Sequence, residues 1–75
     1  MEEQSESELR TRLEKLEAEE REISALRRKL HDRLASFPNE VTQQQEREVS
    51  AKRRELHAQI DDVRVKLRQL QGREP

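Results

Sequence analysis

The sequence predicts an all-α protein folded as an antiparallel two-helix coiled-coil hairpin. Mostly apolar residues recur at a 4–3 spacing from Leu9 to Phe37 and from Thr42 to Leu70, which is the heptad pattern of a coiled coil. A proline, Pro38, interrupts this pattern near the middle of the chain. The composition is 44% charged with one Phe and no Trp, Tyr or Cys, which argues against a compact globular core.

The first helix is expected over about residues 5–36, with Ser5 or Ser7 as its N-terminal cap. Proline disfavours the helical conformation at the residue before it and lacks a backbone N–H. The helix should therefore end just before Pro38, and the turn is expected at about residues 37–41.

The second helix is expected over about residues 42–71. Thr42 followed by Gln45 fits a capping box, and Asn39 is an alternative cap.

The chain should form one domain, residues 1–75, in which Gly72 and Pro75 end the second helix. A link this short predicts that the two helices pack antiparallel within one chain. One kinked helix that pairs with a second chain is the alternative.

The two columns of the coiled-coil seam differ in character. All d positions are apolar, namely Leu9, Leu16, Ile23, Leu30, Phe37, Val49, Leu56, Val63 and Leu70. The a positions mix aliphatic and charged residues, namely Leu13, Glu20, Arg27, Leu34, Glu46, Arg53, Ile60 and Leu67. Charges in a seam cost stability unless they are paired or solvated. They serve either to set the register of the helices or to hold a ligand.

The charged a positions belong to a fifteen-residue segment that occurs twice, as residues 20–34 and 46–60, with nine identical positions. At about 100° per residue, five side chains of the second copy fall within an arc of about 80°. They form a polar stripe of Glu46, Ser50, Arg53, His57 and Asp61. The first copy repeats the stripe as Glu20, Ser24, Arg27 and His31, with Ala35 in place of the aspartate.

Symmetry predicts how the two stripes meet. A two-fold axis that exchanges two antiparallel helices keeps each face on its own side, so both stripes should share one face of the hairpin. Glu20 should then face the Asp61 end, and Arg27 should lie near Arg53. Two facing arginines should repel each other, and a bound anion would relieve this repulsion.

The residue types of the stripe suit a guanine nucleotide. Arginine pairs bidentately with phosphate or with guanine O6 and N7. A carboxylate accepts hydrogen bonds from the Watson–Crick edge of guanine, and Ser and His add further hydrogen bonds. Because the pattern is presented twice with two-fold symmetry, a two-fold symmetric guanine nucleotide is the ligand expected.

The spacing Glu-x3-Ser-x2-Arg-x3-His-x3-Asp of the second copy resembles the signature of RsiG proteins, which are actinobacterial anti-sigma factors that bind cyclic di-GMP on an antiparallel helical hairpin. The resemblance covers residues 20–35 and 46–61. It implies that cyclic di-GMP, as two molecules, binds both stripes and that the loaded protein sequesters a WhiG-type sigma factor.

The chain departs from the RsiG signature at three positions. His31 and His57 stand where that signature has Gln, and Ala35 stands where it has an acidic residue. If the first copy binds weakly, a homodimer would supply two complete stripes. Hairpin monomer and homodimer are therefore both left open by the sequence.

Other functional classes fit the sequence less well. Catalysis is not expected, because nothing in the sequence forms a nucleophile–base pair, and His31 and His57 lack the further ligands of a metal site. A net charge of −1 argues against direct DNA binding, although Arg27–Lys29 and Lys52–Arg54 are local basic clusters. No apolar run suits a membrane span or signal peptide, so a cytoplasmic protein is expected. A ligand-free structural coiled-coil adaptor is the main alternative.

Residues outside the seam are expected either to contact a partner or to form a solvated face. Leu26 at a g position and Val65 at an f position are candidate contacts for the sigma factor. The remaining charges, among them Glu17, Arg28 and Arg68, are expected to form a solvated face with ion pairs one helical turn apart.

Overall fold

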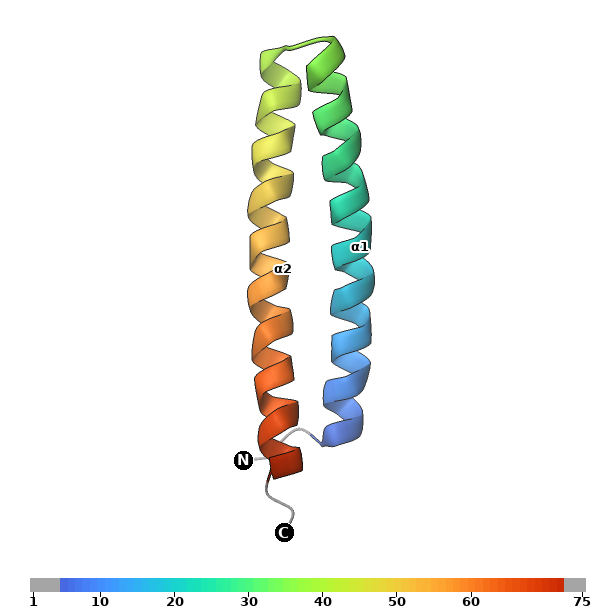
Figure 1. Cartoon of the computed structure of the whole chain (residues 1–75), viewed down its shortest axis with the longest axis vertical. Coiled ribbons are helices and arrows are strands. Elements are labelled where there is room, and N and C mark those ends of the chain that lie inside the picture. The colour runs from blue at the N-terminus through green and yellow to red at the C-terminus, as the bar shows by residue number, and fades with distance from the viewer. Residues whose placement is uncertain (1–4, 73–75) are drawn as a thin grey trace.

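The computed structural model describes residues 5–72, which form two long α-helices. Helix α1 spans Glu6–Ser36 and helix α2 spans Glu40–Gly72. The helices lie side by side and antiparallel, joined by a tight turn at one end, in a rod of 57 × 20 × 16 Å (Figure 1). The predicted all-α helical hairpin is confirmed.

Both ends of α1 are capped by local hydrogen bonds. The Ser5 Oγ accepts a hydrogen bond of 3.1 Å from the backbone N–H of Glu8, so Ser5 is the N-cap. At the other end, the Phe37 N–H donates to the Arg33 carbonyl at 2.7 Å. Phe37 itself has left the helical conformation, at φ −139° and ψ 81°, as expected for the residue before a proline.

Phe37 does not continue the d column of the seam. Its side chain is 74% exposed, so the expectation that it lies in the seam is wrong. The physical reason is the same proline restriction, because a residue outside the helix no longer follows the helical repeat that aligns d positions with the partner helix.

Helix α2 begins at the alternative cap rather than at the expected capping box. The Asn39 Oδ1 accepts a hydrogen bond of 2.7 Å from the Thr42 N–H, and the Asn39 carbonyl accepts one of 3.1 Å from the Gln43 N–H. Thr42 is inside the helix and only 4% exposed, so its expected capping role is wrong. Pro75, expected to help end this helix, lies outside the described residues.

The apolar core is concentrated in the half of the hairpin away from the turn. One cluster of buried residues there contains Leu9, Leu16, Leu56, Ile60 and Val63, with Leu13, Ile23, Leu67 and Leu70 packed against it. Burying each such side chain stabilises the fold by about 1.5–3 kcal/mol. Between this cluster and the turn, charged residues occupy all the a positions except Leu34, and these charged residues help to build the site described below.

Within residues 5–72, neither helix has a stretch apolar and long enough to cross a membrane.

Candidate functional site

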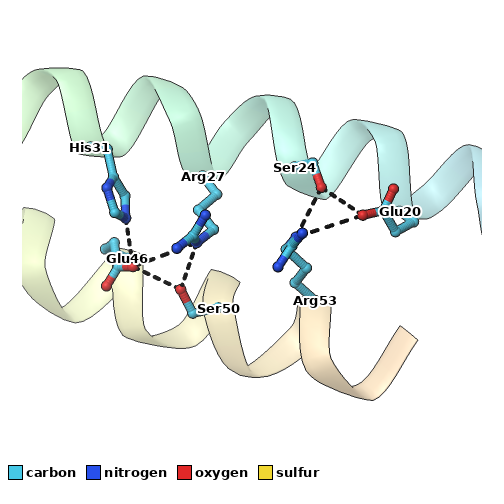
Figure 2. A network of polar contacts seen from close by, with 7 residues as sticks. All are labelled: Glu20, Ser24, Arg27, His31, Glu46, Ser50 and Arg53. Atoms are coloured by element: carbon cyan, nitrogen blue, oxygen red, sulfur yellow. Dashed lines mark hydrogen bonds and ion pairs between the residues drawn. The ribbon is translucent and has the colours of Figure 1, made fainter. Parts of the chain in front are cut away.

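Eight polar side chains from the two repeats meet on one face at the middle of the hairpin. We call this group the polar cluster. It contains Glu20, Ser24, Arg27 and His31 from α1 and Glu46, Ser50, Arg53 and His57 from α2, and Figure 2 shows seven of them. The seam carries these residues at a and e positions, which explains why the two stripes face each other.

One half of the polar cluster is centred on Glu20. The Ser24 Oγ donates a hydrogen bond to Glu20 Oε2 at 2.8 Å and accepts one from Arg53 Nε at 3.1 Å. Arg53 Nε lies 3.6 Å from the same carboxylate oxygen, and His57 Nε2 lies 2.9 Å from it. A single oxygen of Glu20 therefore collects a hydroxyl, a guanidinium and an imidazole.

The other half repeats this arrangement with the helices exchanged. The Ser50 Oγ donates to Glu46 Oε1 at 2.7 Å and accepts from Arg27 Nε at 3.2 Å (Figure 2). Arg27 Nε lies 3.9 Å from Glu46 Oε1, and His31 Nε2 lies 2.9 Å from it. The near-equality of the two sets of distances shows an approximate two-fold axis through the centre of the polar cluster.

The relative placement expected from symmetry agrees with the described geometry. Glu20 and Asp61 line one surface hollow, and Arg27 and Arg53 line another. Hydrogen bonds within the polar cluster join every polar residue of the two stripes except Asp61. Ala35 is exposed beside the turn end.

The two arginines are not left to repel each other. Each guanidinium is held by the serine and the carboxylate of the opposite helix, and this pairing was not anticipated from the sequence. An antiparallel register explains it, because Arg27 is opposite Ser50 when Arg53 is opposite Ser24. The carboxylates therefore supply the compensation that was expected from a bound anion.

The arginines nevertheless keep donors available. Across residues 5–72, the hydrogen bonds that Arg27 and Arg53 donate come from Nε, and their terminal nitrogens Nη1 and Nη2 have no protein partner there. The two arginine side chains are 39% and 37% exposed, against 21% for each of Glu20 and Glu46. The carboxylates thus form the floor of the polar cluster, and the free guanidinium edges are open to a ligand.

Two surface hollows on this face differ in their charged side chains. Ser24, Arg27, Arg28, His31 and Arg53 line the first, which therefore has three guanidiniums and suits an anion. The second, beside it along the hairpin, has the three carboxylates of Glu17, Glu20 and Asp61 together with the guanidiniums of Arg21 and Arg64. Together they offer phosphate-binding and base-binding chemistry next to each other.

One of these lining residues pairs differently from the expectation. Glu17 was expected on a solvated face with pairs along its own helix, but its Oε2 accepts a hydrogen bond of 2.9 Å from Arg64 Nη2 across the hairpin. Arg28 is exposed, as expected for the solvated face, and it also lines the hollow of the two cluster arginines. The heptad positions indicate the pairing of Glu17 with Arg64, because both residues occupy e positions, on the same side of the seam as Ser24 and Ser50.

Hydrogen bonding within the polar cluster lowers the pKa of both glutamates. For Glu20, the Ser24 hydroxyl has the largest effect and His57 the next, while partial burial acts in the opposite direction. For Glu46, the pKa is lowered first by Ser50 and then by His31, again against partial burial. Both carboxylates are therefore ionised across the physiological pH range.

Acid is expected to destabilise the hairpin through Glu20 and Glu46. Folding lowers the pKa of both glutamates. Their contribution to the free energy of unfolding is therefore complete above the ordinary pKa of 4.5, and it is lost as the pH falls through their lower pKa in the folded state. The free energy of unfolding in urea, measured from about pH 7 to about pH 3, should fall more steeply for the wild type than for the double variant Glu20→Gln/Glu46→Gln.

The control for this pH experiment is Glu19→Gln/Glu55→Gln, since both residues are exposed and lack ion pairs within residues 5–72. Its curve should keep the wild-type slope. Parallel curves for all three proteins would show that the polar cluster does not link folding to pH.

The face opposite the polar cluster is less polar. Leu26 is 43% exposed and lines a shallow hollow with Leu30 and Val49, flanked by Arg33 and Glu48. Val65, the other residue considered as a contact, is 44% exposed. Among residues 5–72, no group of three or more His, Cys, Asp or Glu side chains is arranged to hold a metal ion.

Comparison with known proteins finds no match to a protein-family model, to a curated protein or to a solved structure.

Proposed function

We propose that this chain is a cyclic di-GMP-dependent anti-sigma factor that binds the dinucleotide on the polar cluster and, when loaded, sequesters a WhiG-type sigma factor. The observation that carries the proposal is the pair of arginines, Arg27 and Arg53, each anchored through Nε and open at its terminal nitrogens. An arginine held in this way presents its planar fork with little loss of side-chain entropy on binding.

The ligand follows from the chemistry around the two arginines. The open forks suit guanine O6 and N7 or phosphate oxygens, and the neighbouring carboxylates suit the donors on the Watson–Crick edge of guanine. The approximate two-fold axis of the polar cluster favours a ligand with the same symmetry, which cyclic di-GMP has. Two molecules, stacked on each other, would offer enough bases to use both hollows.

The proposed role is binding without catalysis, in the cytoplasm where a sigma factor acts. The hollow containing Leu26, Leu30 and Val49 is the surface we assign to the sigma factor, because it leaves the polar cluster free for the ligand. A homodimer is a second assembly to be tested, in which the complete stripes of two chains share the ligand.

Calorimetry with cyclic di-GMP tests the proposal directly. We expect saturable heat with cyclic di-GMP, none with GTP, and a rise in the unfolding temperature with cyclic di-GMP only. Size-exclusion chromatography with light scattering, with and without ligand, then separates hairpin monomer from homodimer. Binding to a WhiG-type sigma factor should require the dinucleotide. Absence of both heat and thermal stabilisation would refute the nucleotide-binding role.

A ligand-free structural coiled coil is the second candidate function. The observation that favours it is the internal pairing of the polar cluster, where every charged member has a partner on the opposite helix. Polar residues in a seam can fix register alone. This alternative predicts no nucleotide binding. Salt-dependent DNA binding without nucleotide would support instead the third class, a direct nucleic-acid binder.

A further inference from the structure

The two ends of the polar cluster differ chemically, although the cluster itself is symmetric. Beyond its histidine, the stripe on α2 continues to Asp61, whereas the stripe on α1 continues to Ala35. Asp61 is exposed and lines the same hollow as Glu20 and His57. Within residues 5–72 its carboxylate has no hydrogen-bonding or ion-pairing partner, so both its oxygens are available to a ligand.

An ion pair closes the outer side of the hollow at the Asp61 end. Arg64 Nη2 and Glu17 Oε2 are 2.9 Å apart across the two helices, and both residues line this hollow. The residues at the corresponding positions of the other copy are Pro38 and Gln43, which carry no charge. The turn end therefore has neither the free carboxylate nor the bridge that bounds it.

We propose that the site is one-ended, so that the Asp61 end selects guanine whereas the Ala35 end accepts guanine or adenine. This inference rests on the proposed function. Guanine presents two donors, N1–H and the N2 amino group, and one carboxylate accepts both. Adenine presents an N1 acceptor beside its amino group, and that acceptor repels a carboxylate. The methyl group of Ala35 neither accepts hydrogen bonds from the guanine donors nor repels the adenine acceptor.

The two arginines add a preference for guanine at both ends of the site, so the ends differ in the degree of their selectivity. Arg27 and Arg53 read O6 and N7 of guanine wherever they contact a base, and adenine offers a donor in place of O6. A mixed cyclic dinucleotide with one guanine and one adenine should bind with its guanine at the Asp61 end. This mixed ligand should lose only the arginine contribution to binding at the Ala35 end. Cyclic di-AMP should lose the contributions to binding at both ends.

Calorimetry on the full chain with three ligands tests the inference. Cyclic di-GMP should bind most tightly, the mixed cyclic GMP–AMP within about tenfold of it, and cyclic di-AMP about 100-fold or more weaker. A mixed ligand as weak as cyclic di-AMP would overturn the one-ended site. No binding of cyclic di-GMP would instead refute the proposed function, so the two failures are distinguishable.

Two substitutions, the second with a matched control, locate the selectivity for guanine. Asp61→Asn should weaken cyclic di-GMP about tenfold or more and narrow its advantage over cyclic di-AMP. Ala35→Asp should widen the gap between cyclic di-GMP and the mixed ligand by about tenfold, whereas Ala35→Asn should not. Thermal unfolding of each variant checks the fold, which matters because an aspartate near the end of α1 opposes the helix dipole. An unchanged gap in a folded Ala35→Asp variant would also overturn the inference.

Discussion

Replacing Arg53 by alanine is expected to weaken cyclic di-GMP binding by about 100-fold or more. The substitution removes an open guanidinium fork from the centre of the site and leaves the surrounding geometry largely in place. Glu20 keeps its hydrogen bonds to Ser24 and His57, so the carboxylate is not stranded. Calorimetry measures the affinity, and thermal unfolding without ligand checks that the hairpin is intact.

Two further variants make the Arg53 result specific. Arg68→Ala removes the same charge from an exposed position on the same helix, outside the polar cluster, and should leave the affinity near the wild-type value. Arg53→Lys keeps the charge but loses the planar fork, so it should restore only a small part of the binding. Full binding by Arg53→Lys would show that the site attracts the ligand by charge alone, and equal losses in Arg53→Ala and Arg68→Ala would reject the assigned site.

Replacing Leu56 by alanine is expected to unfold most of the protein. Leu56 is 1% exposed and belongs to the main apolar cluster. Removing a buried leucine side chain in this way costs about 2–5 kcal/mol. A domain of this size has a core worth only about 3–5 kcal/mol in total. The loss therefore approaches the whole stability of the hairpin, which circular dichroism in urea would measure directly.

The control for Leu56→Ala is Leu26→Ala, at a residue that is 43% exposed. It should cost under about 1 kcal/mol, because a large part of its surface is already in contact with water. Because Leu26 lies in the surface assigned to the sigma factor, the same variant should bind cyclic di-GMP normally. Strong helical signal and an unchanged unfolding curve for Leu56→Ala would contradict the position of the core.

The helices themselves were predictable because their determinants are local. The heptad spacing and the restriction that Pro38 places on the preceding residue predicted an all-α hairpin, and that fold is confirmed. The choice between Asn39 and Thr42 as the cap of α2 was not resolved by sequence, since each has a suitable side chain. The Thr42 N–H donates to the Asn39 side chain and Thr42 itself lies inside α2, which identifies Asn39 as the cap.

The candidate site was predictable as two stripes, but its internal pairing was not. The 3.6-residue repeat of the helix places Glu, Ser, Arg and His of each copy on one face, and this needs no knowledge of the partner helix. Which serine each arginine contacts depends on the axial register of α1 against α2. That register is fixed by how Leu9, Leu16, Leu56, Ile60 and Val63 pack together.

Two helices, a break at Pro38, a heptad seam and a duplicated polar stripe can all be read from the amino-acid sequence, because each follows from residues close together along the chain. The packing of α1 against α2 is needed to see that the opposite helix anchors Arg27 and Arg53, and that Glu17 and Arg64 bound the hollow containing Asp61. Such contacts join residues 23 to 47 positions apart, so their geometry is set by helix packing rather than by local conformation.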